Sequence, residues 1–455
     1  MNLGKGKQRG VFARMARNVG WLAGSRGFIG ILSIAYLAIA ARALGPKRFG
    51  EFALVLTYGQ LIANVVQFQS WKGVIRFGAA HLAAGNRDGL ARLFGFTATL
   101  DAASTIVGTA IAVGGVELAA PILHWPAELR LPAAVFGCIV LLASGGTPSG
   151  MLRLFDRFDL QAFTEAIGPI VRFAGSAVAW AAGWPTVGFL AVWGAATILQ
   201  TLAQWIAVVA IHGSRLTFGR AAFMQALREN RRLWRFMIQT NLSNSLGLFW
   251  MQLGTLAVGA VSGPVQAGGF RIANRIAKGL VKPVETITRA LYPELARLIA
   301  TNDHLTARKV LTRLTWIAAA LALTAVLIIG LAGATILRLI AGESFEFAHG
   351  FLFLLSIAAA IDLVGFALEP FHSAHGRSGR ILRSRAIGAA LYGVLLALLL
   401  PTIGPEGAAL ASVAASSVIF AQLALSTRQI LSRQLANAGA VSREQAQAND
   451  QGYGQ

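Results

Sequence analysis

The sequence predicts an all-α polytopic membrane protein with about twelve transmembrane helices. Of its 455 residues, 55% are hydrophobic and only 13% are charged, and the mean hydropathy is +0.61. Apolar runs of about 20 residues, the length at which a helix crosses a bilayer, recur from residue 19 to residue 427. Lysine and arginine gather in every second connection between these runs. Together these three observations indicate a helical membrane bundle and not a soluble core.

Twelve apolar runs are long enough to span a membrane. The first, at 19–41, is too long for the apolar part of a signal peptide and lacks a cleavage site, so we expect it to be retained as a span. The predicted spans are 19–41, 50–70, 92–115, 131–150, 163–182, 187–211, 234–259, 265–288, 310–334, 349–369, 383–401 and 404–427.

The distribution of basic residues predicts the orientation of these spans. An even number of spans places both termini on one side. With both termini in the cytoplasm, 29 of the 40 Lys and Arg residues fall in cytoplasmic segments, five in outer loops and six within spans. This asymmetry follows the positive-inside rule and predicts cytoplasmic N and C termini. It also accounts for most of the net charge of +21, so no nucleic-acid partner is needed to explain that charge.

An internal repeat divides the chain into two pseudo-symmetric six-helix lobes. The same motif joins the first and second spans of each half, with a shift of 218 residues, and both halves share one orientation. Its two copies are Gly45, Pro46, Gly50 and Phe52, then Gly263, Pro264, Gly268 and Phe270. The predicted organisation is a cytoplasmic N-terminal segment at 1–18, an N-lobe at 19–212, a basic cytoplasmic linker at 213–233, a C-lobe at 234–428 and a disordered cytoplasmic tail at 429–455.

Four cations lie inside the predicted eighth span. Their spacing of i, i+4, i+7 and i+11 places them on one helix face. A single cation facing lipid at the centre of a span costs roughly 2.5–3.5 kcal/mol, so we expect this face to line a wet cavity that receives an anion. The alternative is a set of buried ion pairs, but acids within the spans are few. The four residues are Arg271, Arg275, Lys278 and Lys282.

Other polar residues fall on the first two spans of each half. Gln60 and Asn64 occupy the second span, and Asn244 the seventh; these amides either bind sugar hydroxyls or join helices to one another. Arg26 in the first span is either a second cavity cation or the partner of an acid. Arg172 in the fifth span is predicted to snorkel towards the interface.

Two acids within spans are candidates for ion coupling. Asp101 and Asp362 either exchange protons or sodium ions during transport or form salt bridges with the cations above. The single cysteine, Cys138, has no metal-site spacing, and the histidines form no known metal or catalytic motif. The sequence therefore predicts neither a bound metal nor an enzyme.

With these features the chain resembles the multidrug/oligosaccharidyl-lipid/polysaccharide exporter (MOP) superfamily, in particular its Wzx-type O-antigen and exopolysaccharide flippase branch. The resemblance covers residues 15–430. It rests on the two six-helix lobes, on the Leu-Gly-Pro-x-x-x-Gly motif from Leu44 to Gly50, and on Leu291, Tyr292 and Pro293 at the end of the eighth span. It implies a MATE-like V-shaped bundle that alternates between inward-open and outward-open states.

The resemblance further implies that the protein exports undecaprenyl-pyrophosphate-linked oligosaccharide across the bacterial inner membrane, for O-antigen, capsule or exopolysaccharide synthesis. Its partners would be this substrate, membrane lipids and a polysaccharide polymerase with its export machinery. The alternatives are a multidrug exporter of the same superfamily, expected to have a neutral or acidic cavity, and a lipid II flippase, which usually has two further spans. The residues expected to line the cavity are Arg26, Gln60, Asn64, Asn244, Arg271, Arg275, Lys278 and Lys282.

Overall fold

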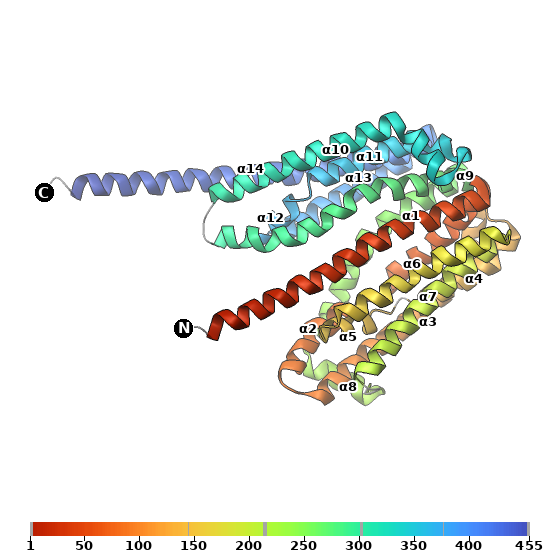
Figure 1. The fold of residues 1–455 in the computed structure, drawn as a ribbon, viewed down its shortest axis with the longest axis horizontal. Coiled ribbons are helices and arrows are strands. Elements are labelled where there is room, and N and C mark those ends of the chain that lie inside the picture. The colour runs from red at the N-terminus through yellow and green to blue at the C-terminus, as the bar shows by residue number, and fades with distance from the viewer. Residues whose placement is uncertain (1–2, 144, 213–215, 301–303, 376, 453–455) are drawn as a thin grey trace. The chain divides into compact units, whose positions relative to one another are not determined.

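The computed structural model describes residues 3–143, 145–212, 216–300, 304–375 and 377–452. Within these ranges every regular element is a helix, which confirms the predicted all-α class (Figure 1). The elements are α1 Leu3–Val66, α2 Ser70–Ala83, α3 Arg87–Ile122, α4 Ala127–Leu142, α5 Thr147–Leu154, α6 Phe158–Ala181, α7 Thr186–His212, α8 Arg220–Glu229, α9 Leu233–Ala300, α10 His304–Ala341, the 3₁₀ helix η1 Glu343–Ala348, α11 His349–Val364, α12 Leu368–Ala374, α13 Ser378–Ile403 and α14 Pro405–Gly452.

Helices α1 and α9 each contain two of the twelve predicted spans, joined across a kink, whereas the predicted spans 131–150 and 349–369 each extend over two helices, α4 with α5 and α11 with α12. In the described part of the chain, eight helical segments are long and apolar enough to cross a membrane. The polytopic class is therefore confirmed. Helix α14 differs from expectation in continuing to Gly452, into the tail for which the composition predicted disorder. Alanine and glutamine, which are frequent in that tail, are good helix formers.

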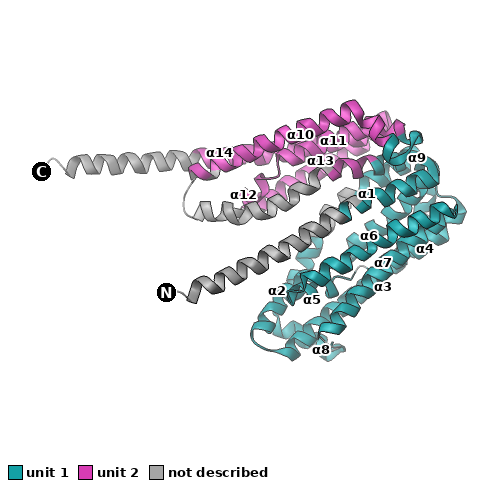
Figure 2. Ribbon diagram, viewed as in Figure 1, with its two compact units in different colours: residues 1–272, 338–345 teal, residues 273–337, 346–455 magenta. Residues whose placement is uncertain are grey.

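The chain forms two compact units (Figure 2). Unit 1 comprises Met1–Ile272 with the short segment Arg338–Phe345, and unit 2 comprises Ala273–Leu337 with Glu346–Gln455. Helix α9 contributes to both units. The division into lobes at the 213–233 linker stays a prediction.

Unit 1 is built around α1, which contacts α3, α4, α6 and α7. Phe52, after the kink of α1, is fully buried, and its ring lies 4.9 Å from that of Trp193 and 6.4 Å from that of Phe189 on α7. In unit 2, α14 packs against both α11 and α13. There Leu311, Phe371 and other apolar side chains form a buried cluster. Each unit thus has an apolar core of its own.

Two glycines bend α1 and α9 in the same way. Gly45 has φ 68° and ψ 174°, and Gly263 has φ 82° and ψ 175°. A positive φ is accessible to glycine at little cost because glycine has no Cβ. Each glycine precedes a proline, which begins the following helical segment. The matching backbone angles, 218 residues apart, support the internal repeat read from the sequence.

Just beyond the two kinks, α1 and α9 approach each other at backbone distance. A Cβ built on Gly268 would lie 3.0 Å from the Cα of Gly50, and a Cβ on Gly50 would overlap the carbonyl oxygen of Pro264. Gly50 and Gly268 are equivalent positions of the repeat. Equivalent residues that contact each other lie near a local two-fold axis, so the repeat is visible in the packing as well as in the chain.

The predicted fourth span, 131–150, is interrupted in the structure. Helix α4 ends at Leu142 and α5 begins at Thr147, with Gly146 before it and a proline in its first turn. The sequence analysis treated this run as one continuous span. The break is a correction, and Gly145, Gly146 and Pro148 are its local cause.

Asp101 of α3 holds the first residues of two short helices. Ser70 begins α2 and Thr147 begins α5. The Asp101 carboxylate accepts a hydrogen bond from the Ser70 hydroxyl, one of 2.6 Å from the Thr147 hydroxyl and one of 3.0 Å from the Thr147 backbone N–H. Ser70 and Thr147 are fully buried. The carboxylate thus pairs one N–H group that α5 leaves free, and it complements the positive dipole ends of both helices.

We expect Asp101→Asn to destabilise unit 1 by about 1–3 kcal/mol, because an amide cannot accept all the hydrogen bonds of the carboxylate. The measurement is the thermal unfolding midpoint of the detergent-purified protein. Asp88→Asn, at an exposed position on the same helix, is the matched control and should shift the midpoint much less. Equal shifts for the two variants would show that Asp101 does not hold the helix starts.

We expect Gly50→Ala to lower stability by about 1–3 kcal/mol, because the added methyl group must push α1 and α9 apart. Gly114→Ala provides the comparison, since a Cβ at Gly114 in the middle of α3 would meet nothing within 4 Å. That substitution should be neutral or slightly stabilising. The same thermal assay decides the matter, and a Gly50→Ala protein as stable as the parent would contradict the close approach.

Candidate functional site

Arg271 is the predicted cavity cation whose position in unit 1 is clearest. Its guanidinium donates hydrogen bonds to the Thr57 hydroxyl and, at 3.5 Å, to the carbonyl oxygen of Ala53. Thr57 is fully buried, and its hydroxyl in turn donates to the same carbonyl at 2.7 Å. Ala53 is the repeat equivalent of Arg271. The arginine of one repeat copy is therefore hydrogen-bonded to the main chain of the other copy. This bond lies about one helical turn after the contact between Gly50 and Gly268, in the chain direction of both helices.

The polar residues of the second half of α1 have mixed roles. Gln60 is half-buried and accepts a hydrogen bond of 3.3 Å from the side-chain amide of Gln252 on α9. Asn64, one turn further along α1, is also half-buried. Gln67 donates at 2.7 Å to the carbonyl of Leu141 and so joins α1 to the end of α4. The sequence left two roles open for Gln60 and Asn64, and the bond between Gln252 and Gln60 joins two helices.

Arg275 and Lys278 continue the cationic face along α9, and both are half-buried. They lie four and seven residues after Arg271 on one uninterrupted helical segment, so all three share a helix face. In unit 2, the Asp362 carboxylate is hydrogen-bonded to Ser416 and lies within electrostatic range of Lys278. An ion pair between Asp362 and this lysine was one of the two roles that the sequence left open for this acid.

Three of the predicted cavity residues have side chains outside the described part of the structure. They are Arg26 on α1, and Asn244 and Lys282 on α9. The other five are described: Gln60, Asn64 and Arg271 belong to unit 1, and Arg275 and Lys278 belong to unit 2. Within unit 1, α1 and α9 bring the first three of them onto two contacting helices.

Asp101 has three hydrogen-bond donors from α2 and α5, as described above. Its proposed part in ion coupling stays a prediction. The snorkelling predicted for Arg172 stays a prediction, and the structure shows the partners of this residue. Its guanidinium donates at 3.1 Å to the Thr197 hydroxyl on α7 and lies 6.0 Å from the ring centroid of Tyr36. A nearby acceptor and ring let the charge stay within the helix bundle.

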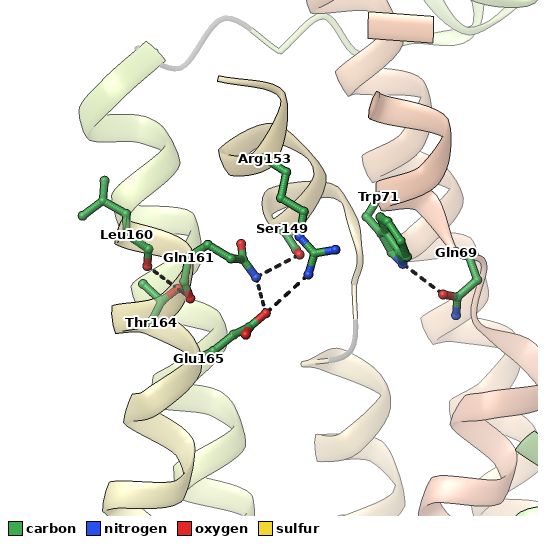
Figure 3. A network of polar contacts seen from close by, with 8 residues as sticks. All are labelled: Gln69, Trp71, Ser149, Arg153, Leu160, Gln161, Thr164 and Glu165. Carbon is green, nitrogen blue, oxygen red and sulfur yellow. Dashed lines mark hydrogen bonds and ion pairs between the residues drawn. The ribbon is translucent and has the colours of Figure 1, made fainter. Parts of the chain in front are cut away.

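The sequence analysis missed a polar network that ties α2, α5 and α6 together (Figure 3). Arg153 and Glu165 form an ion pair of 3.4 Å, and the Arg153 guanidinium lies 4.7 Å from the Trp71 ring. Gln161 is fully buried and donates to Glu165 and, at 3.1 Å, to Ser149. The i, i+4 spacing of Gln161 and Glu165 predicts that these two side chains interact on one helix, but it does not predict their contacts with Ser149 and Arg153 of α5.

No group of three or more His, Cys, Asp or Glu residues suited to a metal ion occurs among the described residues. The chemistry that the arrangement supports is recognition of anions and hydroxyl groups. Arginine provides a planar pair of donors that matches phosphate oxygens, lysine adds a mobile positive charge, and amides pair with hydroxyl groups.

Comparison with known proteins places these features in a family. A family model described as "Polysaccharide biosynthesis protein" matches residues 15–299. The chain is 29% identical over 300 residues to the inner membrane protein YghQ of Escherichia coli (strain K12), an alignment that covers 64% of this chain and 82% of that protein.

Solved structures share the fold at low sequence identity. An inward-facing MATE multidrug resistance transporter of the MOP superfamily matches with a TM-score of 0.65 and 13% identity, over 92% of this chain and 95% of that chain. The lipid II flippase MurJ in an inward closed conformation matches with a TM-score of 0.65 and 14% identity, over 89% and 86% of the two chains. These likenesses concern the fold.

The family model covers more than half of the chain, and the fold is that of MOP transporters. The chain therefore belongs to the polysaccharide biosynthesis protein family, and it shares its fold with MATE transporters and with MurJ.

Proposed function

We propose that this protein moves a polyprenyl-pyrophosphate-linked oligosaccharide from the cytoplasmic to the outer face of the bacterial inner membrane. The cationic face of α9 carries the proposal. It presents Arg271, Arg275 and Lys278 in succession, and Arg271 is held at the crossing of α1 and α9. A pyrophosphate is the part of such a substrate that several cations in a row would bind.

The comparisons support the substrate class without identifying the glycan. The family is described by polysaccharide biosynthesis, and a solved structure of the same fold is a flippase for lipid II. In the proposed cycle, the head group enters the cavity while the polyprenyl tail stays in the bilayer, since burying the tail in a cationic cavity would be unfavourable. Alternating opening of the two sides then transfers the head group.

The membrane potential or a proton or sodium gradient would drive the cycle. Asp362, near Lys278, is the better candidate for coupling, because protonation of its carboxylate would change the charge beside the proposed phosphate site. Asp101 is the second candidate. We further propose that a polysaccharide polymerase and export machinery receive the product.

A multidrug exporter is the second candidate function, because the MATE transporters share the fold. Cationic drugs require a neutral or acidic cavity, and the face of α9 has the opposite charge. Cells that express the protein should therefore gain no resistance to cationic drugs. A gain in resistance that is lost on neutralising Asp362 would favour the exporter over the flippase.

We expect Arg275→Gln to reduce polysaccharide export roughly 10- to 100-fold, because a charge-assisted hydrogen bond to phosphate contributes about 1.5–3 kcal/mol. Arg275→Lys should retain an intermediate rate, and Arg271→Glu should abolish export. The measurement is surface polysaccharide in a deletion strain that carries each variant at equal protein level, together with mass spectrometry of lipid-linked oligosaccharides in the membrane.

Arg228→Gln is the control for this series, because Arg228 lies on the exposed surface of α8, away from the cationic face. It should export normally. Normal export by Arg271→Glu, or the absence of any lipid-linked oligosaccharide build-up in the deletion strain, would show that the proposed substrate is wrong.

A further inference from the structure

A short segment from the C-terminal half of the chain belongs to unit 1. Arg338–Phe345 is coloured with unit 1 in Figure 2, whereas the residues on both sides of it in the chain belong to unit 2. The segment consists of the last turn of α10 and the beginning of η1. The predicted topology places it in an outer loop, on the same side as the kink at Gly45.

Arg42, on α1 just before this kink, holds the end of α10. Its guanidinium donates to the carbonyl oxygen of Ile340 at 3.2 Å, to that of Arg338 at 3.5 Å, and to that of Leu339. The last four carbonyl groups of a helix receive no hydrogen bond from the N–H groups of the same helix, and they form the negative end of the helix dipole. A single arginine therefore caps the C-terminus of a helix that lies about 300 residues away in the chain.

Apolar packing completes the contact. Phe345 is fully buried, and its ring lies 5.6 Å from that of Phe49 in an edge-to-face arrangement. Phe49 directly precedes Gly50, the residue at the close approach of α1 and α9. Gly342, with φ 101°, lets the chain turn from α10 into η1 beside Arg42. The first half of the chain thus meets two segments of the second half, 338–345 and α9, at the same end of unit 1.

We propose that Arg42 is a latch, a positioning residue that keeps the outer end of the transport pathway closed by capping α10. This inference rests on the proposed alternating-access function. The Arg42 side chain is exposed, so its hydrogen bonds exchange readily with water and the latch can release in each cycle. The repeat equivalent of Arg42 is Ala260, so only the first repeat supplies such a cap.

The latch can be tested by measuring the distance between spin labels on its two sides. Cys138, the single cysteine, is replaced by serine, and labels are attached at Lys47→Cys and Glu343→Cys, both at exposed positions. Pulsed electron resonance on the full protein in lipid nanodiscs then gives the distance distribution. In the parent, the latched arrangement should dominate the distribution.

We expect Arg42→Gln to increase the population of longer distances about fivefold, the change that accompanies a loss of about 1 kcal/mol. Arg42→Lys should lie between the two, since an ammonium group can still bond to the helix end. Arg130→Gln is the matched control, because Arg130 is predicted to lie on the same outer side but pairs with Glu117 at 3.0 Å within the first half. It should leave the distribution unchanged.

An unchanged distribution for Arg42→Gln overturns the latch, and so does an equal shift for Arg130→Gln. The outcome is separate from that of the transport assay. A latch that responds as expected in a protein that exports no lipid-linked oligosaccharide would refute the proposed substrate alone. Loss of export in the Arg271 and Arg275 variants, with no response at Arg42, would refute the latch alone.

Discussion

The contact between the backbones of Gly50 and Gly268 is the constraint on which the rest of unit 1 depends. A Cβ at Gly50 would overlap the backbone of Pro264, and a Cβ at Gly268 would lie only 3.0 Å from the Cα of Gly50, so the main chains themselves set the separation of α1 and α9. At this separation the Arg271 guanidinium reaches the main chain at Ala53. Phe49, next to the contact, supplies the surface on which Phe345 packs. A side chain at either glycine would move all of these groups together.

Unit 1 satisfies several of its charged groups with local partners. Asp101 accepts hydrogen bonds from the first residues of two short helices, Arg153 pairs with Glu165, and Arg172 donates to Thr197. These arrangements join helices and keep the charges from facing lipid, which supports a structural role for them. The cations of α9 differ in forming a row on one helix face. This contrast is the reason for assigning the substrate to α9 and not to the polar groups of the other helices.

Fold class and repeat could be predicted from the sequence because they depend on strong patterns. These patterns are the lengths of the spans, the placement of the arginines and the Gly-Pro motif, and each can be recognised without knowing how the helices pack. The break between α4 and α5 has a signal in the sequence, Gly145, Gly146 and Pro148, which the length of the surrounding apolar run outweighed in the prediction. The hydrogen-bond acceptors of Arg271 and Arg42 could not be predicted from the sequence. Both arginines bond to backbone carbonyls far away in the chain, and a carbonyl has no signature in a sequence.

The bond from Arg271 to Ala53 has a consequence for how the two repeat copies diverge. The acceptor is a main-chain oxygen, which every residue possesses, so no substitution at position 53 removes the acceptor itself. Selection on position 53 is then limited to the size of its fully buried side chain. Position 271 is more restricted, because the bond needs a side chain that can donate it. After the duplication, one copy could remain uncharged and small while the other acquired a cation, without any compensating change in the first.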